Sequence, residues 1–91
     1  MPTYYLTPMT AAEIHAAATL LHWIASCRKV KFATEDGETR TAHVRSIHWE
    51  QGREDIRETE VRLTMSTGWD DYWSGAEIIK MIRNHEMVPT K

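Results

Sequence analysis

The first 27 residues of this 91-residue chain contain one charged side chain, Glu13, and neither lysine nor arginine. Within them, the segment TAAE at residues 10–13 matches a capping box, in which a threonine hydroxyl and a glutamate carboxylate each accept a hydrogen bond from a free amide at a helix start. The pattern predicts a helix over residues 10–27, preceded by an extended arm over residues 1–9. A surface helix normally carries a charged outer face, so we expect this helix to be covered by the rest of the domain or by a second molecule.

One side of the predicted helix is apolar at helical spacing, and we expect it to face the core. Its members are Ile14, Ala17, Leu21 and Ile24, widened by Leu20, Trp23 and Cys27 and continued by Arg28. The opposite side is polar but uncharged near neutral pH, and it consists of His15, Thr19, His22 and Ser26. We expect this polar side to mediate self-association, giving a homodimer that is sensitive to pH because histidine changes charge at about pH 6.5.

A β-hairpin is predicted over residues 29–49, because an Asp-Gly pair at residues 36–37 lies between two strand-like runs. Pairing Val30 with Val44 keeps the apolar side chains on one face and leaves a three-residue loop around the Asp-Gly pair. Beyond Val44 the apolar side chains change phase, which predicts a bulge or sharp bend near Arg45–Ser46. A long bent strand of this kind is typical of small barrels.

The rest of the chain alternates turns with short elements. Alternating apolar residues predict a half-buried strand over residues 56–67, after a polar loop. The aromatic residues 69–73 are expected to form a turn and a short strand. The segment SGAE at residues 74–77 is a second capping-box match, which opens a predicted helix over residues 75–84, and Met87-Val88 is a candidate edge strand.

These elements predict one α+β domain spanning residues 1–91: an N-terminal helix, a curved, barrel-like antiparallel sheet of three to five strands, and a short C-terminal helix. The length allows a single core. The longest apolar run is only a few residues, too short to span a membrane. Because Cys27 is the only cysteine, no intrachain disulfide can form, and we expect a cytoplasmic protein.

Motifs for catalysis or cofactor binding are missing from the sequence. There is no nucleophile elbow, phosphate-binding glycine loop or HExxH pair, so we expect a protein that is not an enzyme and needs no cofactor. His15 and His22 lie two helical turns apart, roughly 10 Å by helical rise, which is too far for one zinc ion without a third element. We therefore predict no metal site, and we interpret Cys27 as a small buried side chain.

Two groups of residues are candidate binding sites. Basic side chains gather on one face of the predicted hairpin, where they could contact phosphates: Lys29, Lys31, His43 and Arg45. The second group contains three large aromatic residues and two carboxylates: Trp69, Asp70, Asp71, Tyr72 and Trp73. Aromatic anchors dominate protein interfaces, and the carboxylates favour a basic partner. The alternative for this second group is that both tryptophans point into the core while the aspartates form the turn.

The element order resembles that of Sm-like and SH3-like small barrels. More narrowly, Ala11 to Trp49 is similar in layout to the bacterial Rho-binding antiterminator (Rof-type) family, in which an N-terminal helix precedes a strand-DGE-strand unit. Here that unit spans Lys29 to Glu38 and reads KVKFATEDGE. The resemblance implies a small-barrel architecture. Members of that family bind the Rho termination factor through an acidic surface that includes a helix, whereas the helix predicted here has only one acid, Glu13, so only the architecture is carried over.

The sequence as a whole predicts a small non-catalytic regulator or inhibitor that acts by binding a protein partner. Its size is typical of proteins encoded by phages and other mobile elements. The alternative function is that of a small barrel that binds RNA or DNA through its basic sheet face. The net charge of −2 excludes a strongly basic nucleic-acid tail but does not decide between these two functions.

Overall fold

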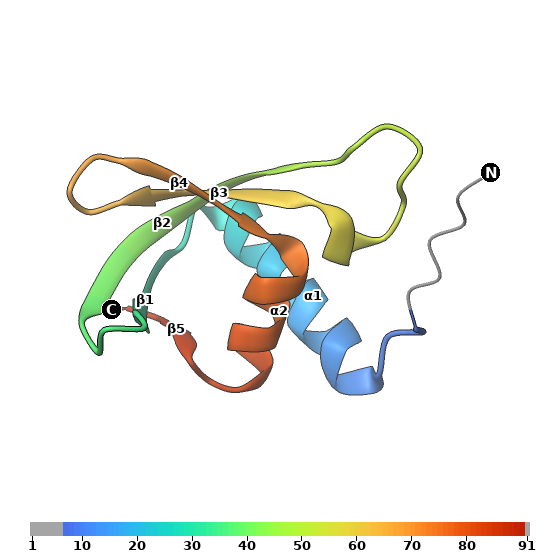
Figure 1. The fold of residues 1–91 in the computed structure, drawn as a ribbon, viewed down its shortest axis with the longest axis horizontal. Coiled ribbons are helices and arrows are strands. Elements are labelled where there is room, and N and C mark those ends of the chain that lie inside the picture. The colour runs from blue at the N-terminus through green and yellow to red at the C-terminus, as the bar shows by residue number, and fades with distance from the viewer. Residues whose placement is uncertain (1–6, 91) are drawn as a thin grey trace.

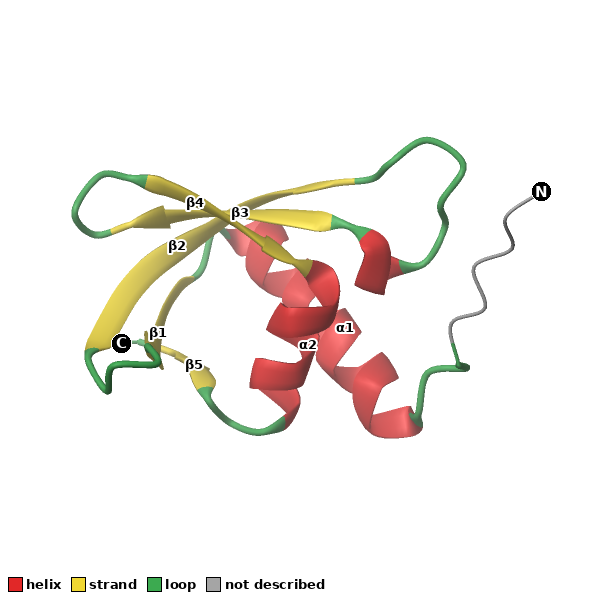
Figure 2. Ribbon diagram, viewed as in Figure 1, coloured by secondary structure: helices red, strands yellow, loops and turns green. Residues whose placement is uncertain are grey.

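The computed structural model describes residues 7–90, which form one antiparallel sheet with two helices packed against a single face (Figure 1). The elements in chain order are α1 (Ala11–Ser26), β1 (Lys29–Ala33), β2 (Thr39–His48), the 3-10 helix η1 (Ile56–Glu58), β3 (Glu60–Met65), β4 (Asp70–Ser74), α2 (Gly75–Arg83) and β5 (Met87–Pro89). The strand order is β4-β3-β2-β1-β5. The sheet curves around the helices without closing (Figure 2), so the predicted α+β fold class is confirmed. Residues 1–6 of the expected N-terminal arm lie outside the described residues.

Helix α1 begins with the predicted capping box. The Thr10 hydroxyl accepts a hydrogen bond from the Glu13 amide at 3.2 Å, and the Glu13 carboxylate accepts one from the Thr10 amide at 3.1 Å. The helix ends where Cys27 adopts a left-handed conformation with φ of 50°, and the Arg28 amide donates to the Trp23 carbonyl at 2.9 Å. Both ends therefore satisfy backbone groups that a helix leaves free.

The side of α1 that faces the core differs from the prediction. The buried residues are Ala16, Ala17, Leu20 and Trp23, whereas the predicted core residues Ile14 and Leu21 are 58% and 45% exposed. Apolar residues occupy every side of this helix except the narrow polar one. The helical periodicity of the apolar residues therefore does not single out the side that faces the core. The rest of the domain does not cover this helix completely, because Ile14, His15, Leu21 and His22 are exposed. Of the two expected covers, the second molecule therefore stays a prediction.

The β1–β2 hairpin forms as predicted, but its register differs by two residues. Val30 pairs with Ala42 rather than with Val44. The Thr34 amide donates to the Glu38 carbonyl at 2.8 Å, and this bond encloses a loop of residues 35–37. Three-residue loops favour a left-handed residue at their last position, and Gly37, with φ of 83°, occupies that position. A shift of two residues keeps every side chain on its predicted face.

The bend predicted near Arg45–Ser46 is confirmed, because the pairing of β2 with β3 shifts between Val44 and Ser46. The predicted strand over residues 56–67 begins later than expected. Its first residues form η1, whose start is capped by the Asp55 carboxylate accepting the Arg57 amide at 2.8 Å. The predicted strand after Trp69, the second helix and the edge strand at Met87 are all present as β4, α2 and β5.

Both helices and the covered sheet face contribute to one core. Gly75, the first residue of α2, is buried and packs closely against η1. The apolar residues of the core are Ala16, Ala17, Leu20, Trp23, Val30, Phe32, Ala42, Val44, Ile56, Val61, Leu63, Ile78, Ile79, Met81 and Met87. The tip of the β3–β4 hairpin extends away from the two helices that cover this core (Figure 1).

Candidate protein-binding groove

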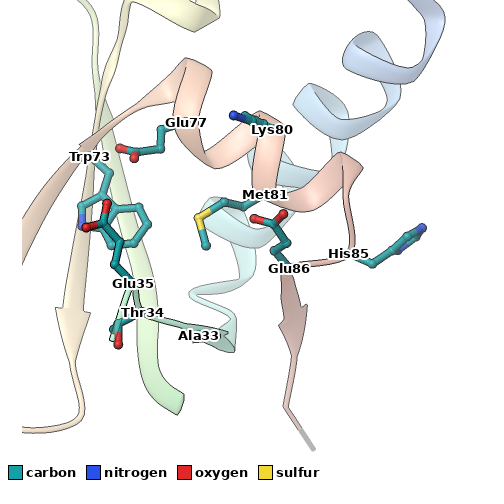
Figure 3. Close-up of a pocket in the computed structure, with 9 residues that line it drawn as sticks. All are labelled: Ala33, Thr34, Glu35, Trp73, Glu77, Lys80, Met81, His85 and Glu86. Atoms are coloured by element: carbon teal, nitrogen blue, oxygen red, sulfur yellow. The ribbon is translucent and has the colours of Figure 1, made fainter. Parts of the chain in front are cut away.

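Two neighbouring cavities lie on the side of the sheet that carries the helices. The larger, about 800 Å³, is drawn in Figure 3 and is lined by Ala33, Thr34, Glu35, Trp73, Glu77, Lys80, Met81, His85 and Glu86. The smaller, about 330 Å³, is lined by Phe32, Thr34, Arg40, Met65, Thr67, Trp69, Asp70, Asp71 and Trp73. Because Thr34 and Trp73 line both cavities, we treat them as one site, which we call the groove.

Trp73 is held in the groove by the pairing of β4 with β3. It lies opposite Val61, which is fully buried, so its side chain lies on the same sheet face as the core. Its ring meets the Phe32 ring edge to face at a centroid distance of 5.0 Å, and its indole nitrogen donates to the Asp71 carboxylate at 3.0 Å. These contacts fix the indole between the core and the groove. The alternative that both tryptophans point into the core therefore describes Trp73 in part, because Trp73 is half-buried and packs against the core.

Trp69 sits in the turn between β3 and β4. The Met65 amide donates to the Trp69 carbonyl at 2.7 Å, and Gly68 adopts a φ of 96°, which glycine tolerates without strain. The Trp69 side chain is 76% exposed, the highest exposure among the large apolar residues described. A large indole left exposed beside a cavity is a feature of binding surfaces.

Strand alternation divides the predicted acidic-aromatic segment between two faces. Asp71 pairs with buried Leu63 and, like Trp73, lies on the groove side of the sheet. Tyr72 pairs with Arg62 on the opposite face and is 56% exposed. Asp70 lines the smaller cavity, and its carboxylate accepts the Thr64 hydroxyl at 2.8 Å. Four of the five predicted residues therefore line the groove and Tyr72 does not, although the Asp70 carboxylate is bonded to Thr64 on the other face.

The groove contains residues that the sequence analysis did not identify. Three carboxylates line the larger cavity, contributed by Glu35 after β1, Glu77 on α2 and Glu86 before β5. Within residues 7–90, none of these carboxylates has a hydrogen bond or an ion pair. In the sequence, only Glu77 stood out, as part of the SGAE capping-box match. Glu35 and Glu86 lie far from this motif in sequence. Lys80 and His85 are the basic residues of this cavity.

The basic residues predicted as a nucleic-acid site share the sheet face that the helices leave uncovered. The corrected register places Lys29 opposite His43 and Lys31 opposite Thr41. His43 in turn pairs with Thr64, which pairs with Asp70.

Arg45 occupies the bulge of the same face. It donates to the Thr64 hydroxyl at 3.1 Å and to the Cys27 sulfur at 3.0 Å. Arg45 is thus engaged within the protein, and Asp70 brings negative charge to the edge of this basic face. Cys27, interpreted from the sequence as buried, is half-buried.

The polar side of α1 is exposed, but its hydroxyl groups are used internally. Thr19 donates to the His15 carbonyl at 3.1 Å, and Ser26 donates to the His22 carbonyl at 2.9 Å. Beside the two exposed histidines runs an exposed apolar stripe at alternating spacings of four and three residues, formed by Ile14, Ala18, Leu21 and Ala25. The sequence analysis had assigned part of this stripe to the core. In the structure the stripe is an apolar surface of α1 that a second molecule can contact.

No group of three or more His, Cys, Asp or Glu side chains in residues 7–90 could hold a metal ion. Across the same part of the chain, no helix is both long enough and apolar enough to cross a membrane.

Comparison with known proteins gives no match to any family model, curated protein or solved structure. The resemblance to the Rof-type family therefore stays a prediction from the sequence.

Proposed function

We propose that this protein is a small, non-catalytic regulator or inhibitor that binds a segment of a protein partner in the groove. The observation that carries the proposal is that Trp69, which is 76% exposed, lines the smaller cavity. This cavity adjoins the larger one, since Trp73 lines both. Exposed aromatic side chains next to a concave site supply most of the binding energy in many interfaces. The proposal keeps the cytoplasmic setting expected from the single cysteine. It also keeps the phage or mobile-element origin that the small size suggests.

The chemistry of the groove supports binding rather than reaction. Its apolar contacts come from Trp73, Met81 and Met65, and its polar groups are mostly carboxylates. These groups suit a partner segment that presents apolar and basic side chains. The charged rim sets orientation, while the aromatic floor supplies buried area.

Selection from a random displayed dodecapeptide library, with the full chain as bait, tests this proposal. We expect enriched peptides to lose affinity about tenfold or more for a Trp69→Ala variant. The melting temperature should stay nearly unchanged, because this side chain is largely solvent-exposed. The matched control is Trp49→Ala, which removes another exposed tryptophan, 44% exposed, that lines neither cavity.

Equal binding of the selected peptides to wild type and Trp69→Ala would overturn the proposal. So would a selection that enriches nothing above background. Trp73→Ala is a poorer test than Trp69→Ala, because loss of the Trp73 contacts with Phe32 and Asp71 is expected to lower the melting temperature as well.

Self-association through α1 is a second part of the proposal. The exposed stripe of Ile14, Ala18, Leu21 and Ala25 is uncharged and apolar, and two such stripes can pack without burying a charge. Sedimentation at micromolar concentration and neutral pH should show a dimer that Ala18→Glu converts to a monomer. The control is Ala76→Glu, at an exposed site on α2. A monomeric wild type would end this part of the proposal.

Nucleic-acid binding by the uncovered sheet face is the alternative function. The observation in its favour is that Lys29, Lys31 and Arg45 lie on the same sheet face as the exposed Tyr72, which could stack on a base. The two functions differ in their response to salt. Phosphate contacts give a steep negative slope of log affinity against log salt, and our proposal expects a random oligonucleotide to show a slope near zero.

A further inference from the structure

We propose that the larger cavity of the groove is a binding pocket for an arginine side chain presented by the partner protein. This inference rests on the proposed function and names the chemistry of the segment that enters the groove. It follows from the shape of the cavity, the side chains at its floor and the charges at its rim.

The floor of the pocket is apolar and aromatic. Figure 3 shows the Met81 thioether pointing toward the Trp73 indole, with the two side chains on opposite sides of the cavity. The volume, about 800 Å³, is ample for one long side chain and part of its backbone. A flat cation placed on an indole ring is attracted by the negative charge of the ring face.

The rim of the pocket is acidic. Glu35, Glu77 and Glu86 all line the cavity, whereas Figure 3 shows the His85 ring pointing away from it. Lys80 is the only lysine or arginine of the lining, so three carboxylates outweigh one ammonium group. This excess favours a cation inside the pocket and disfavours an acidic ligand.

Glu77 is available for a ligand because its capping box is open. The Ser74 hydroxyl accepts the Glu77 amide at 3.2 Å, but in residues 7–90 the Glu77 carboxylate makes no return bond to the Ser74 amide. Glu77 instead lies at the edge of the cavity and forms part of its lining (Figure 3). Because the Glu77 carboxylate makes no bond within its own capping box and lies beside an apolar floor, it can pair with a cation of the partner protein.

The pocket suits arginine better than the other side chains a partner could offer. A guanidinium group is planar, stacks on an aromatic ring and donates in two directions to carboxylates, whereas an ammonium group is a compact and strongly hydrated point charge. An apolar side chain would fill the floor but would leave the carboxylates partly desolvated without compensation.

The sheet edge beside the pocket is poorly suited to backbone pairing, which supports recognition by a side chain. Successive backbone amides along β4 point alternately toward β3 and away from the sheet. The Tyr72 amide points away from the sheet and donates to the Asp71 carboxylate at 3.1 Å. A partner strand adding to β4 would have to break this bond. Carboxylates placed in this way protect an edge strand from augmentation.

The experiment uses the peptides selected on the full chain and compares their binding to carboxylate variants. We expect the enriched peptides to share an arginine, and binding to fall about tenfold with Glu77→Gln. Glu54→Gln is the matched control, since Glu54 is exposed and lines neither cavity. Replacing the shared arginine of a peptide by citrulline, which keeps the shape and removes the charge, should weaken binding as much as Glu77→Gln does.

A second measurement places the arginine in the pocket. The indole N–H resonance of Trp73 should shift when the arginine peptide is added and stay in place with the citrulline peptide. Peptides that lose affinity for Trp69→Ala but carry no arginine, or that bind Glu77→Gln and wild type equally, would overturn the arginine pocket and leave the protein-binding function standing. Peptides that are indifferent to Trp69→Ala would overturn both.

Discussion

The two helices begin with nearly the same four residues, TAAE at residues 10–13 and SGAE at residues 74–77, yet the two starts differ in structure. Both use the first hydroxyl to accept the amide three residues later. At α1 the glutamate returns the bond and also lies 3.9 Å from Arg57. At α2 the glutamate faces a cavity instead. The motif therefore sets where a helix begins, and the tertiary surroundings decide what its glutamate does.

The second residue of each motif differs for a packing reason. Ala11 is exposed, so its methyl group meets solvent. Gly75 is buried, and a Cβ atom there would lie 2.1 Å from the Ile56 carbonyl oxygen and 2.5 Å from the Thr59 hydroxyl. The Gly75 amide donates to the Thr59 carbonyl at 2.8 Å, which ties α2 to the segment before β3. The start of α2 is thus a tight backbone contact between two chain segments, whereas at the start of α1 the neighbouring segment approaches only with the Arg57 side chain.

The largest expected effect is that of Gly75→Ala. Alanine normally stabilises a helix relative to glycine by about 1 kcal/mol, but here the new methyl group has no room. We expect the free energy of unfolding to fall by about 2–3 kcal/mol, and the melting temperature by roughly 10 °C or more. Urea titration measures the first quantity and thermal unfolding followed by circular dichroism measures the second. Ala11→Gly is the control at the open start and should cost less than about 1 kcal/mol.

An increase in stability from Gly75→Ala would show that α2 can move away from η1 at little cost. In that case the orientation of Glu77 toward the groove would depend on a mobile helix. A loss larger than that of Ala11→Gly supports the rigid contact on which the pocket geometry rests.

Removal of the two capping hydroxyls should have smaller effects that differ between the helices. Loss of an N-cap side chain typically costs about 1 kcal/mol. We expect Thr10→Ala to cost more than Ser74→Ala, because Thr10 takes part in a reciprocal pair of bonds and Ser74 in a single one. Chemical denaturation of both variants under the same conditions measures the difference. Equal losses would mean that the return bond of Glu13 adds nothing to the stability of α1.

Local patterns predicted most of the fold. Helix starts, the bulge after Val44 and the edge strand at Met87 each depend on a few neighbouring residues, and each is present. The register of the β1–β2 hairpin was missed because two choices of three-residue loop keep the same faces. The position of Gly37 at the end of the loop, where its positive φ is required, distinguishes them.

The groove could be predicted only in part. Trp69 and Trp73 stood out by composition, and strand alternation explains why Tyr72 lies elsewhere. The carboxylates at the rim come from three segments separated in sequence, so only the fold brings them together. The buried side of α1 could not be chosen either, because its apolar residues surround the helix, and burial is decided by what packs against it.

The smallest expected effect is a difference in the acid stability of the two helix starts, which comes from Glu13. The pKa of Glu13 lies below its usual value, chiefly because its carboxylate accepts a hydrogen bond from the Thr10 amide; the Thr10 hydroxyl and Arg57 act in the same direction, and burial opposes them. A carboxyl group whose pKa is lower in the folded state stabilises the fold above its unfolded pKa, which is about 4.3 for glutamate. That stability is lost as the pH falls through the folded pKa.

Glu13→Gln removes the titrating group and keeps the size of the side chain. We therefore expect the free energy of unfolding of this variant to depend less on pH than that of the wild type below about pH 4.5, and the two curves to converge in stronger acid. Urea titrations at a series of pH values measure both curves. Asp55, whose pKa is lowered mainly by its hydrogen bond from the Arg57 side chain, supplies a further acid-sensitive contact that remains in Glu13→Gln. Parallel curves for the two proteins would mean that the closed capping box stabilises α1 as a neutral hydrogen-bond pair, and the contrast between the two helix starts would then lie in geometry and not in charge.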